Sequence, residues 1–179
     1  MDMNLANKLT LLRIFMIPAF LLVLFLAPAP MGRVVAVVIF IVASLTDLLD
    51  GKIARKYNMV SNFGKFMDPL ADKLLVMSAL VSMVALGDLA AWVVIVILAR
   101  EFAITGFRTL AMEANIVMAA SWWGKVKTTT QMIMIPVLLL QLPFSCMPVI
   151  ERLLVALAVF FTVFSGADYI IKNKQVLMG

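Results

Sequence analysis

The sequence of 179 residues contains no histidine, a single cysteine and only ten acidic residues. Without histidine, an imidazole general base and a phosphohistidine intermediate are excluded, so acid or base chemistry falls to carboxylates, lysine or tyrosine. The single cysteine, Cys146, lies in an apolar stretch and has no second cysteine for a disulfide, a redox pair or a zinc site. The chemistry of this chain is therefore sought among its few carboxylates.

Charge of either sign is scarce, and apolar residues dominate. Hydrophobic residues make up 64% of the chain and charged residues 14%, and the mean hydropathy is +1.09, far from an ordinary soluble composition. A soluble core cannot hide so much apolar surface, whereas a helix bundle can expose it to membrane lipid. A net charge of +5 would favour nucleic acid in a soluble protein, but here it is interpreted as membrane topology, and no nucleic-acid partner is expected. The composition predicts an all-α membrane protein.

Six apolar runs are each long enough, at about 20 residues, to cross a bilayer as a helix. They are expected near residues 9–27, 33–56, 66–86, 90–112, 122–142 and 148–171. Residues typical of turns mark the three connections on one face. These are Pro28, Pro30 and Gly32, then Gly87 and Asp88, then Pro143 and Pro148. The sequence predicts one polytopic membrane domain over residues 1–179 with six transmembrane helices.

The basic residues are divided unevenly between the two faces. Of the 15 lysines and arginines, only Arg33 and Arg152 fall on the face of the three turn-rich connections. By the positive-inside rule both termini are expected to be cytoplasmic. The competing interpretation of residues 1–30 is a secretory signal peptide cleaved near Ala27-Pro28-Ala29, but proline fits poorly at such a cleavage site.

Four of the acidic residues fall within 26 positions, at Asp47, Asp50, Asp68 and Asp72. On helices, spacings of i, i+3 and i, i+4 turn each pair toward one side. Carboxylates gathered near lipid need cations, and a ligand set of oxygens alone suits Mg²⁺ or Mn²⁺. Two such ions would hold the attacking and leaving oxygens of a phosphoryl displacement, and a carboxylate not fully coordinated can act as the base. The alternative is ordinary helix-end charges, solvated or paired with nearby cations.

The aspartates belong to a longer pattern, Asp47-x2-Asp50-Gly51-x2-Ala54-Arg55-x8-Gly64-x3-Asp68-x3-Asp72. This pattern resembles, without gap or substitution, the signature of the CDP-alcohol phosphotransferase family, and eight fixed identities make the match specific. The resemblance extends to the six-span architecture. It implies transfer of a phosphoalcohol group from a CDP-activated donor to an alcohol, with release of CMP. It also implies a homodimer in a bacterial inner or plasma membrane.

The resemblance implies a role for each matching residue. Asp47, Asp50 and Asp68 would be metal ligands, and Asp72 a ligand or the catalytic base. The donor side would be formed by Gly51, Ala54 and Gly64, which leave room for cytidine and diphosphate, by Arg55, which meets diphosphate charge, and by Asn7 and Thr10.

Three further segments resemble the branch of the family whose acceptor is glycerol 3-phosphate. They are Asn7-x2-Thr10-x2-Arg13, Arg100-Glu101 with Arg108, and Gly124-Lys125-x-Lys127-Thr128-x2-Gln131. An acceptor with its own phosphate carries about two negative charges, which arginine and lysine neutralise through charge-assisted hydrogen bonds. The candidates are Arg108 and Lys125 first, then Arg100, Lys127 and Lys73. The alternative for each is a topological signal or a lipid-headgroup contact.

The resemblance therefore implies a membrane enzyme that uses CDP-diacylglycerol and glycerol 3-phosphate and forms phosphatidylglycerol phosphate, and the distribution of basic residues places its active face in the cytoplasm. The nearest rival is a sister enzyme with another acceptor, such as inositol phosphate, serine or phosphatidylglycerol. A rival from another class is a cation transporter, in which intramembrane aspartates line an ion path. Against the transporter, the acids gather at one end of two spans instead of stepping across the bilayer.

Overall fold

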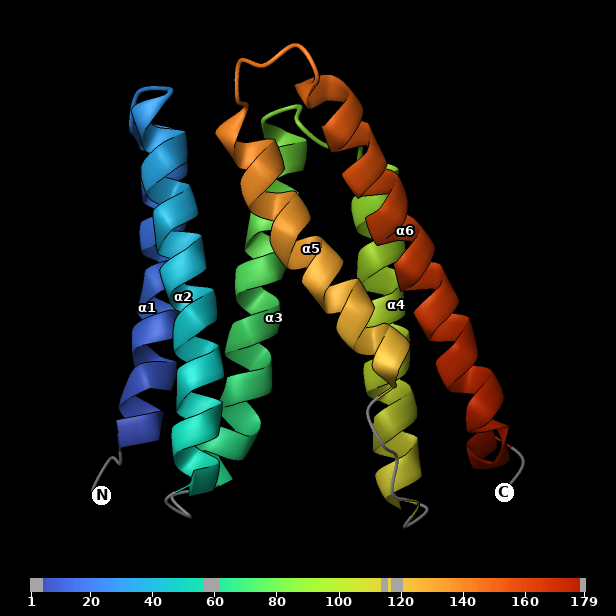
Figure 1. Cartoon of the computed structure of the whole chain (residues 1–179). Coiled ribbons are helices and arrows are strands. Elements are labelled where there is room, and N and C mark those ends of the chain that lie inside the picture. The colour runs from blue at the N-terminus through green and yellow to red at the C-terminus, as the bar shows by residue number, and fades with distance from the viewer. Residues whose placement is uncertain (1–4, 57–61, 114–115, 117–120, 178–179) are drawn as a thin grey trace. The chain divides into compact units, whose positions relative to one another are not determined.

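A computed structural model describes the backbone of residues 5–56, 62–113, 116 and 121–177, and their side chains except at 5–7, 47–56, 62–66, 68–69 and 177. Within these residues the chain forms six α-helices and one short 3₁₀ helix, with no strand (Figure 1). They are α1 (Leu5–Leu26), α2 (Met31–Lys56), α3 (Asn62–Ala85), α4 (Ala91–Glu113), α5 (Trp122–Leu140), α6 (Met147–Lys172) and η1 (Lys174–Leu177). The prediction of an all-helical chain is confirmed, and each helix lies where an apolar run was predicted.

The turn-forming residues separate the helices for identifiable backbone reasons. Gly87, between α3 and α4, has a φ of 78°, a left-handed conformation that glycine adopts without a steric penalty. Pro148 lies in the first turn of α6, where its missing N–H has no helical partner to lose. Gln141 ends α5 with a φ of 45°. Local chain chemistry thus fixes where these helices begin and end.

Two of the described helical segments are long and apolar enough to cross a membrane. They are Lys8–Leu26, with a mean hydropathy of 2.5, and Met147–Lys172, with a mean hydropathy of 2.0. A shorter apolar segment, Met31–Thr46, lies in α2. The apolar helices agree with the expected membrane association, whereas six crossings and cytoplasmic termini stay predictions.

The helices pack as two units, residues 1–85 and 86–179. In the first unit, α1 packs along α2 and also contacts α3 (Figure 1). The ring of Phe20 on α1 meets that of Phe40 on α2, with 6.4 Å between centroids. Thr10 and Arg13 are buried on α1 as well, with exposed fractions of 1% and 0%. A fully buried arginine at a spacing of i, i+3 from a buried threonine gives this apolar helix one polar side.

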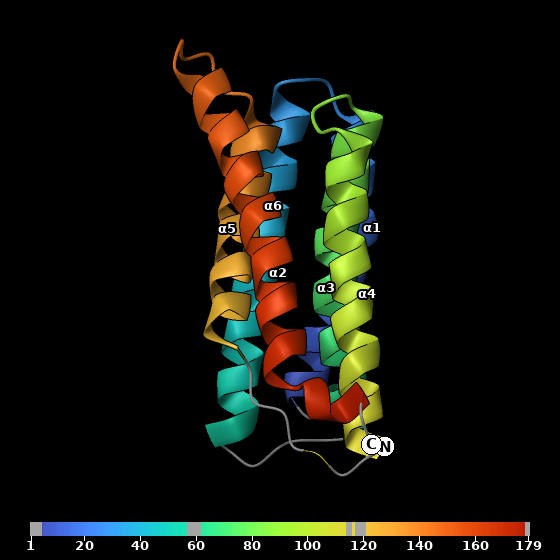
Figure 2. The same ribbon diagram turned by 90° about the vertical axis from the view of Figure 1, so that its right-hand side faces the viewer.

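In the second unit, α6 packs along α5 and against α4 (Figures 1 and 2). Trp123 on α5 stacks on Phe161 of α6 and meets Phe164 edge-on, with centroid distances of 6.1 and 4.9 Å. On the α4 side, a second apolar cluster joins α4 to α6 and is covered by η1. Its members are Ile104, Phe107 and Tyr169, and Val176 of η1 packs against them. These contacts bring together polar residues of α4, α5 and α6, which line the pocket described below.

Candidate functional site

The four predicted metal ligands lie on two consecutive helices of the first unit. Asp47 and Asp50 belong to about the last three turns of α2, and Asp68 and Asp72 to about the first three turns of α3. Because only residues 57–61 separate these helices, the two helix ends stay within about 20 Å of each other. The helical state of all four positions agrees with the spacing from which the site was predicted.

The side chains of Asp47, Asp50 and Asp68 lie outside the described residues, as do those of Asn7, Arg55 and their small neighbours Gly51, Ala54 and Gly64. Asp72 is described and is half-buried on α3. The described side chains contain no group of three or more His, Cys, Asp or Glu residues placed to hold a metal ion. The four aspartates fit a hard divalent cation, because carboxylate oxygens are the ligands that Mg²⁺ and Mn²⁺ prefer. The metal site therefore stays a prediction.

A polar pocket of about 410 Å³ lies among α4, α5 and α6. Three of the predicted phosphate-binding residues, Arg100, Arg108 and Lys125, line this pocket together with one carboxylate, Glu101. The rest of its lining is Ile104, Ser121, Gly124, Thr128, Thr129 and Tyr169. Three cations against one carboxylate form a lining suited to an anion.

Arg100 is held tightly by groups of the protein itself. Its Nη1 donates to Glu101 Oε1 at 3.0 Å, and its Nη2 donates to Ser165 Oγ at 3.1 Å. Its stem passes over Gly166, where an added Cβ would lie 3.1 Å from Arg100 Cγ. Each terminal nitrogen of Arg100 thus gives one of its two N–H groups to a protein partner.

Lys127 contributes to this site through Glu101, without lining the pocket itself. Its side chain is buried, and its Nζ forms an ion pair with Glu101. Lys127 is not among the pocket-lining residues, so its charge balances a carboxylate instead of facing the hollow. Lys73, the remaining candidate, lies on α3 in the first unit.

Arg108 and Lys125 have side chains that are exposed to the pocket and to solvent. Neither forms an ion pair with a carboxylate in the described part of the chain. Arg108 Nε donates to Tyr169 Oη at 3.0 Å, and the guanidinium carbon lies 5.4 Å from the centroid of the same ring. These two residues hold the charge that is available to a ligand.

The N-terminus of α5 adds to the positive character of the pocket. Ser121 caps this helix by accepting a hydrogen bond from Gly124 N at 3.3 Å, and Lys125 follows in the first turns. The free N–H groups and the dipole of a helix N-terminus favour anions. Together with Arg108 and Lys125, this helix end can bind a phosphate group.

Sequence reasoning missed Tyr169 and Ser165, which α6 contributes to the site. Their bonds to Arg108 and Arg100 join residues 61 and 65 positions apart, so no local spacing predicts them. Asp168, also on α6, forms an ion pair with Lys172 one turn later, with 2.8 Å between Asp168 Oδ1 and Lys172 Nζ.

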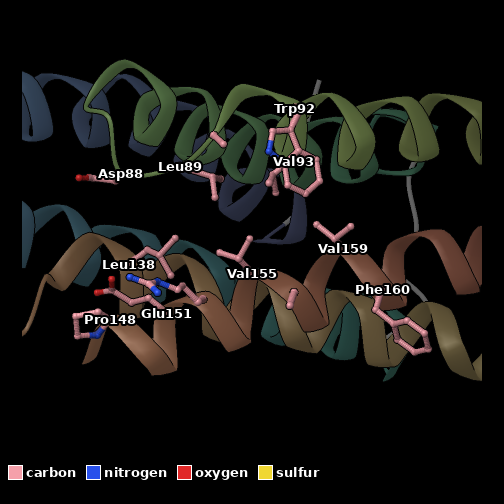
Figure 3. A pocket seen from close by; sticks show the side chains of 13 residues that line it. Asp88, Leu89, Trp92, Val93, Leu138, Pro148, Glu151, Val155, Val159 and Phe160 are labelled. Carbon is pink, nitrogen blue, oxygen red and sulfur yellow. The ribbon is translucent and has the colours of Figure 1, made fainter. Parts of the chain in front are cut away.

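A larger hollow of about 740 Å³ lies toward the other end of the second unit. Its walls are mainly apolar, with Trp92, Val155 and Val159 among them (Figure 3). Its charged lining consists of two carboxylates, Asp88 and Glu151, and one cation, Arg152, whereas the smaller pocket has three cations and one carboxylate, and an excess of carboxylates disfavours phosphate. The pocket among α4, α5 and α6 is therefore the better phosphate site, despite its smaller volume.

Comparisons with known proteins agree with the predicted family. A family model described as CDP-alcohol phosphatidyltransferase matches residues 3–164. A Bacillus subtilis protein named CDP-diacylglycerol–glycerol-3-phosphate 3-phosphatidyltransferase is 46% identical, over 97% of each chain. A Mycobacterium tuberculosis protein named probable phosphatidylglycerophosphate synthase is 45% identical, over 98% of this chain and 84% of its own. A Rickettsia bellii protein with the same name as the Bacillus one is 36% identical, over 94% of each chain.

Proposed function

Because this chain belongs to the CDP-alcohol phosphatidyltransferase family, we propose that it transfers the phosphatidyl group of CDP-diacylglycerol to sn-glycerol 3-phosphate. The products are phosphatidylglycerol phosphate and CMP. The observation that carries this proposal is the near-complete alignment with relatives whose names state that reaction. The basic pocket of the second unit supports the choice of a phosphorylated acceptor.

In the proposed mechanism, the pocket among α4, α5 and α6 holds the phosphate of glycerol 3-phosphate. Arg108 and Lys125 contact it directly, because their charges have no carboxylate partner in the described residues. Arg100 lines the same pocket from a fixed position. Held by its phosphate, the acceptor keeps its free hydroxyl oriented, which lowers the entropic part of the barrier.

The reaction itself is a displacement at the phosphorus that bears diacylglycerol. Asp72 accepts the proton of the acceptor's 1-hydroxyl, and that oxygen forms a bond to phosphorus. The bond from this phosphorus to the bridging oxygen of the diphosphate breaks, and CMP leaves with that oxygen. Arg55 stabilises the charge of the leaving group, since a guanidinium is always protonated and matches phosphate oxygens.

Asp47, Asp50 and Asp68, with Asp72 where it also coordinates, would hold Mg²⁺ or Mn²⁺, and two ions are proposed. Such ions supply electrostatic stabilisation to phosphoryl oxygens. Gly51, Ala54 and Gly64 keep the neighbouring helix surfaces open for the nucleotide, and Asn7 and Thr10 complete the donor side. Thr10 is buried on α1 in the first unit, the unit that also carries the four aspartates.

The proposed setting is a bacterial inner membrane, with six crossings, both termini in the cytoplasm, and a homodimer. The uneven distribution of lysine and arginine supports a cytoplasmic active face. CDP-diacylglycerol would enter from the inner leaflet with its acyl chains still in lipid. Glycerol 3-phosphate would enter from the water phase.

The decisive experiment measures CMP release by the purified full chain in detergent, with CDP-diacylglycerol and one acceptor at a time. Glycerol 3-phosphate is expected to support release, whereas glycerol, inositol phosphate, serine and phosphatidylglycerol are not. A chelator should abolish the activity, and Mg²⁺ or Mn²⁺ should restore it. Release with a different acceptor would assign the chain to a sister enzyme, and no release with any acceptor would favour a cation transporter.

A further inference from the structure

We propose that Tyr169 is a positioning residue that fixes the guanidinium of Arg108 for the acceptor's phosphate. Through this contact Tyr169 sets the preference of the site for a phosphorylated alcohol over a neutral one. The inference rests on the proposed function, because that function places the phosphate in the pocket that Tyr169 and Arg108 line.

The ring of Tyr169 is held rigidly before any ligand binds. Its exposed fraction is only 2%, and it packs in the cluster with Ile104 and Phe107 that Val176 covers. The ring of Phe107 meets it edge-on, with 6.3 Å between centroids and an interplanar angle of 72°. The Tyr169 backbone oxygen accepts a hydrogen bond from Asn173 Nδ2 at 2.8 Å. A side chain packed in this way presents its hydroxyl group at a fixed place.

Arg108 depends on that hydroxyl group for its orientation. It lies on an exposed side of α4, where an arginine side chain would otherwise sample many rotamers. Tyr169 Oη accepts a hydrogen bond from Arg108 Nε, with 3.0 Å between the two atoms, and the guanidinium carbon lies over the same ring. Because the guanidinium is rigid and planar, a bond at Nε fixes the direction of both Nη groups.

The two arginines of the pocket therefore differ in what they offer a ligand. Arg100 donates through Nη1 to Glu101 and through Nη2 to Ser165. Arg108 donates through Nε alone to a described protein group, so both of its Nη groups stay available. A preoriented pair of donors binds two phosphate oxygens at once. A neutral acceptor has no such oxygens and gains nothing from the arrangement.

The test compares the kinetics of wild-type and Tyr169→Phe protein, each with glycerol 3-phosphate and with CDP-diacylglycerol as the varied substrate. Loss of the hydroxyl group should raise the KM for glycerol 3-phosphate about five- to tenfold, the loss expected for one hydrogen bond that orders a ligand-binding group. The kcat and the KM for CDP-diacylglycerol should stay within about twofold of wild type. The matched control is Thr109→Val, which removes a hydroxyl group bonded only to Thr105 O on the same helix.

A double-mutant cycle with Arg108→Lys separates positioning from a general packing defect. Lysine has no Nε–H and no fork, so Tyr169→Phe should add no further rise in the KM of the Arg108→Lys protein. Penalties that multiply in the double variant, or an unchanged KM in Tyr169→Phe, would overturn the inference. If wild-type protein releases no CMP with glycerol 3-phosphate, it is the proposed function that fails.

Discussion

At the scale of single residues, the proposed chemistry depends most on Asp72. Its half-buried side chain lies on α3, and it is the candidate that removes the proton from the acceptor. Asp72→Asn keeps the shape of the side chain but cannot accept that proton, so kcat should fall by at least about 100-fold. CMP release at saturating substrates measures this change.

The matched control for Asp72→Asn is Asp88→Asn, which makes the same chemical change in the second unit, where Asp88 accepts a hydrogen bond from Gln141 Nε2. The control should keep wild-type kcat. A folded Asp72→Asn protein that retains full magnesium-dependent release would remove Asp72 from the role of base. Loss of metal binding in the same protein would instead identify Asp72 as a ligand.

Single residues also mark the limit of what the sequence can predict. The motif around residues 124–131 made Lys127 a candidate for binding the acceptor's phosphate, but a motif looks the same whether a lysine contacts a ligand or forms a buried ion pair. The structure shows that its Nζ pairs with Glu101. Arg108 and Lys125, by contrast, line the pocket. Only the three-dimensional neighbours of each cation distinguish the two cases.

At the scale of helices, the approach of α6 to α4 depends on a glycine. A Cβ added at Gly166 would lie 3.1 Å from Arg100 Cγ, closer than ordinary packing allows. The Arg100 stem must shift by a few tenths of an ångström to admit the methyl group, and its bonds to Glu101 and Ser165 oppose that shift. The overpacking cost of about 1–3 kcal/mol should therefore exceed the gain of up to about 1 kcal/mol from alanine in a helix, and Gly166→Ala should destabilise the fold. A lowered thermal unfolding midpoint in detergent, with a raised KM for glycerol 3-phosphate, is the expected result.

Gly106→Ala, on α4, controls for the effect of the substitution itself. No heavy atom lies within 4 Å of an added Cβ at Gly106, and alanine favours a helix by up to about 1 kcal/mol over glycine. This variant should be as stable as the wild type or more so. Equal midpoints for the Gly166 and Gly106 variants would mean that the contact with Arg100 is not tight.

The helices themselves were predictable because the signals that define them are local. Apolar runs ended by Pro28, by Gly87 and by Pro143 are visible in any window of the sequence, and the observed helix bounds follow them. The pocket was only partly predictable. Tyr169 lines it, and Ser165 holds Arg100, only because α6 packs on α4. No periodicity along one helix encodes contacts across more than 60 residues.

At the scale of the whole molecule, the proposed topology can be tested with the native cysteine. Cys146 is exposed in the connection between α5 and α6, which the positive-inside rule places outside the cytoplasm. A membrane-impermeant maleimide should therefore label the wild-type protein in intact cells. The measurement is labelling before and after the cells are made permeable.

The counterpart is Gln175→Cys in a Cys146→Ser background, since Gln175 is exposed in η1 near the C-terminus. This protein should be labelled only after permeabilisation. Cys146→Ser alone, which has no thiol, gives the background. A reversed pattern would place the active face outside the cytoplasm and contradict the proposed setting.

The ion pair between Glu101 and Lys127 also bears on how the chain enters the bilayer during synthesis. Glu101 lies near the middle of α4, where an unpaired charge costs about 2.5–3.5 kcal/mol to insert. Arg100 on the same helix and Lys127 on α5 both pair with this carboxylate, so its charge is shared between two consecutive helices. In the proposed six-span topology, α4 and α5 should therefore enter lipid more readily as a hairpin, in which the buried lysine and the carboxylate are already paired, than one after the other.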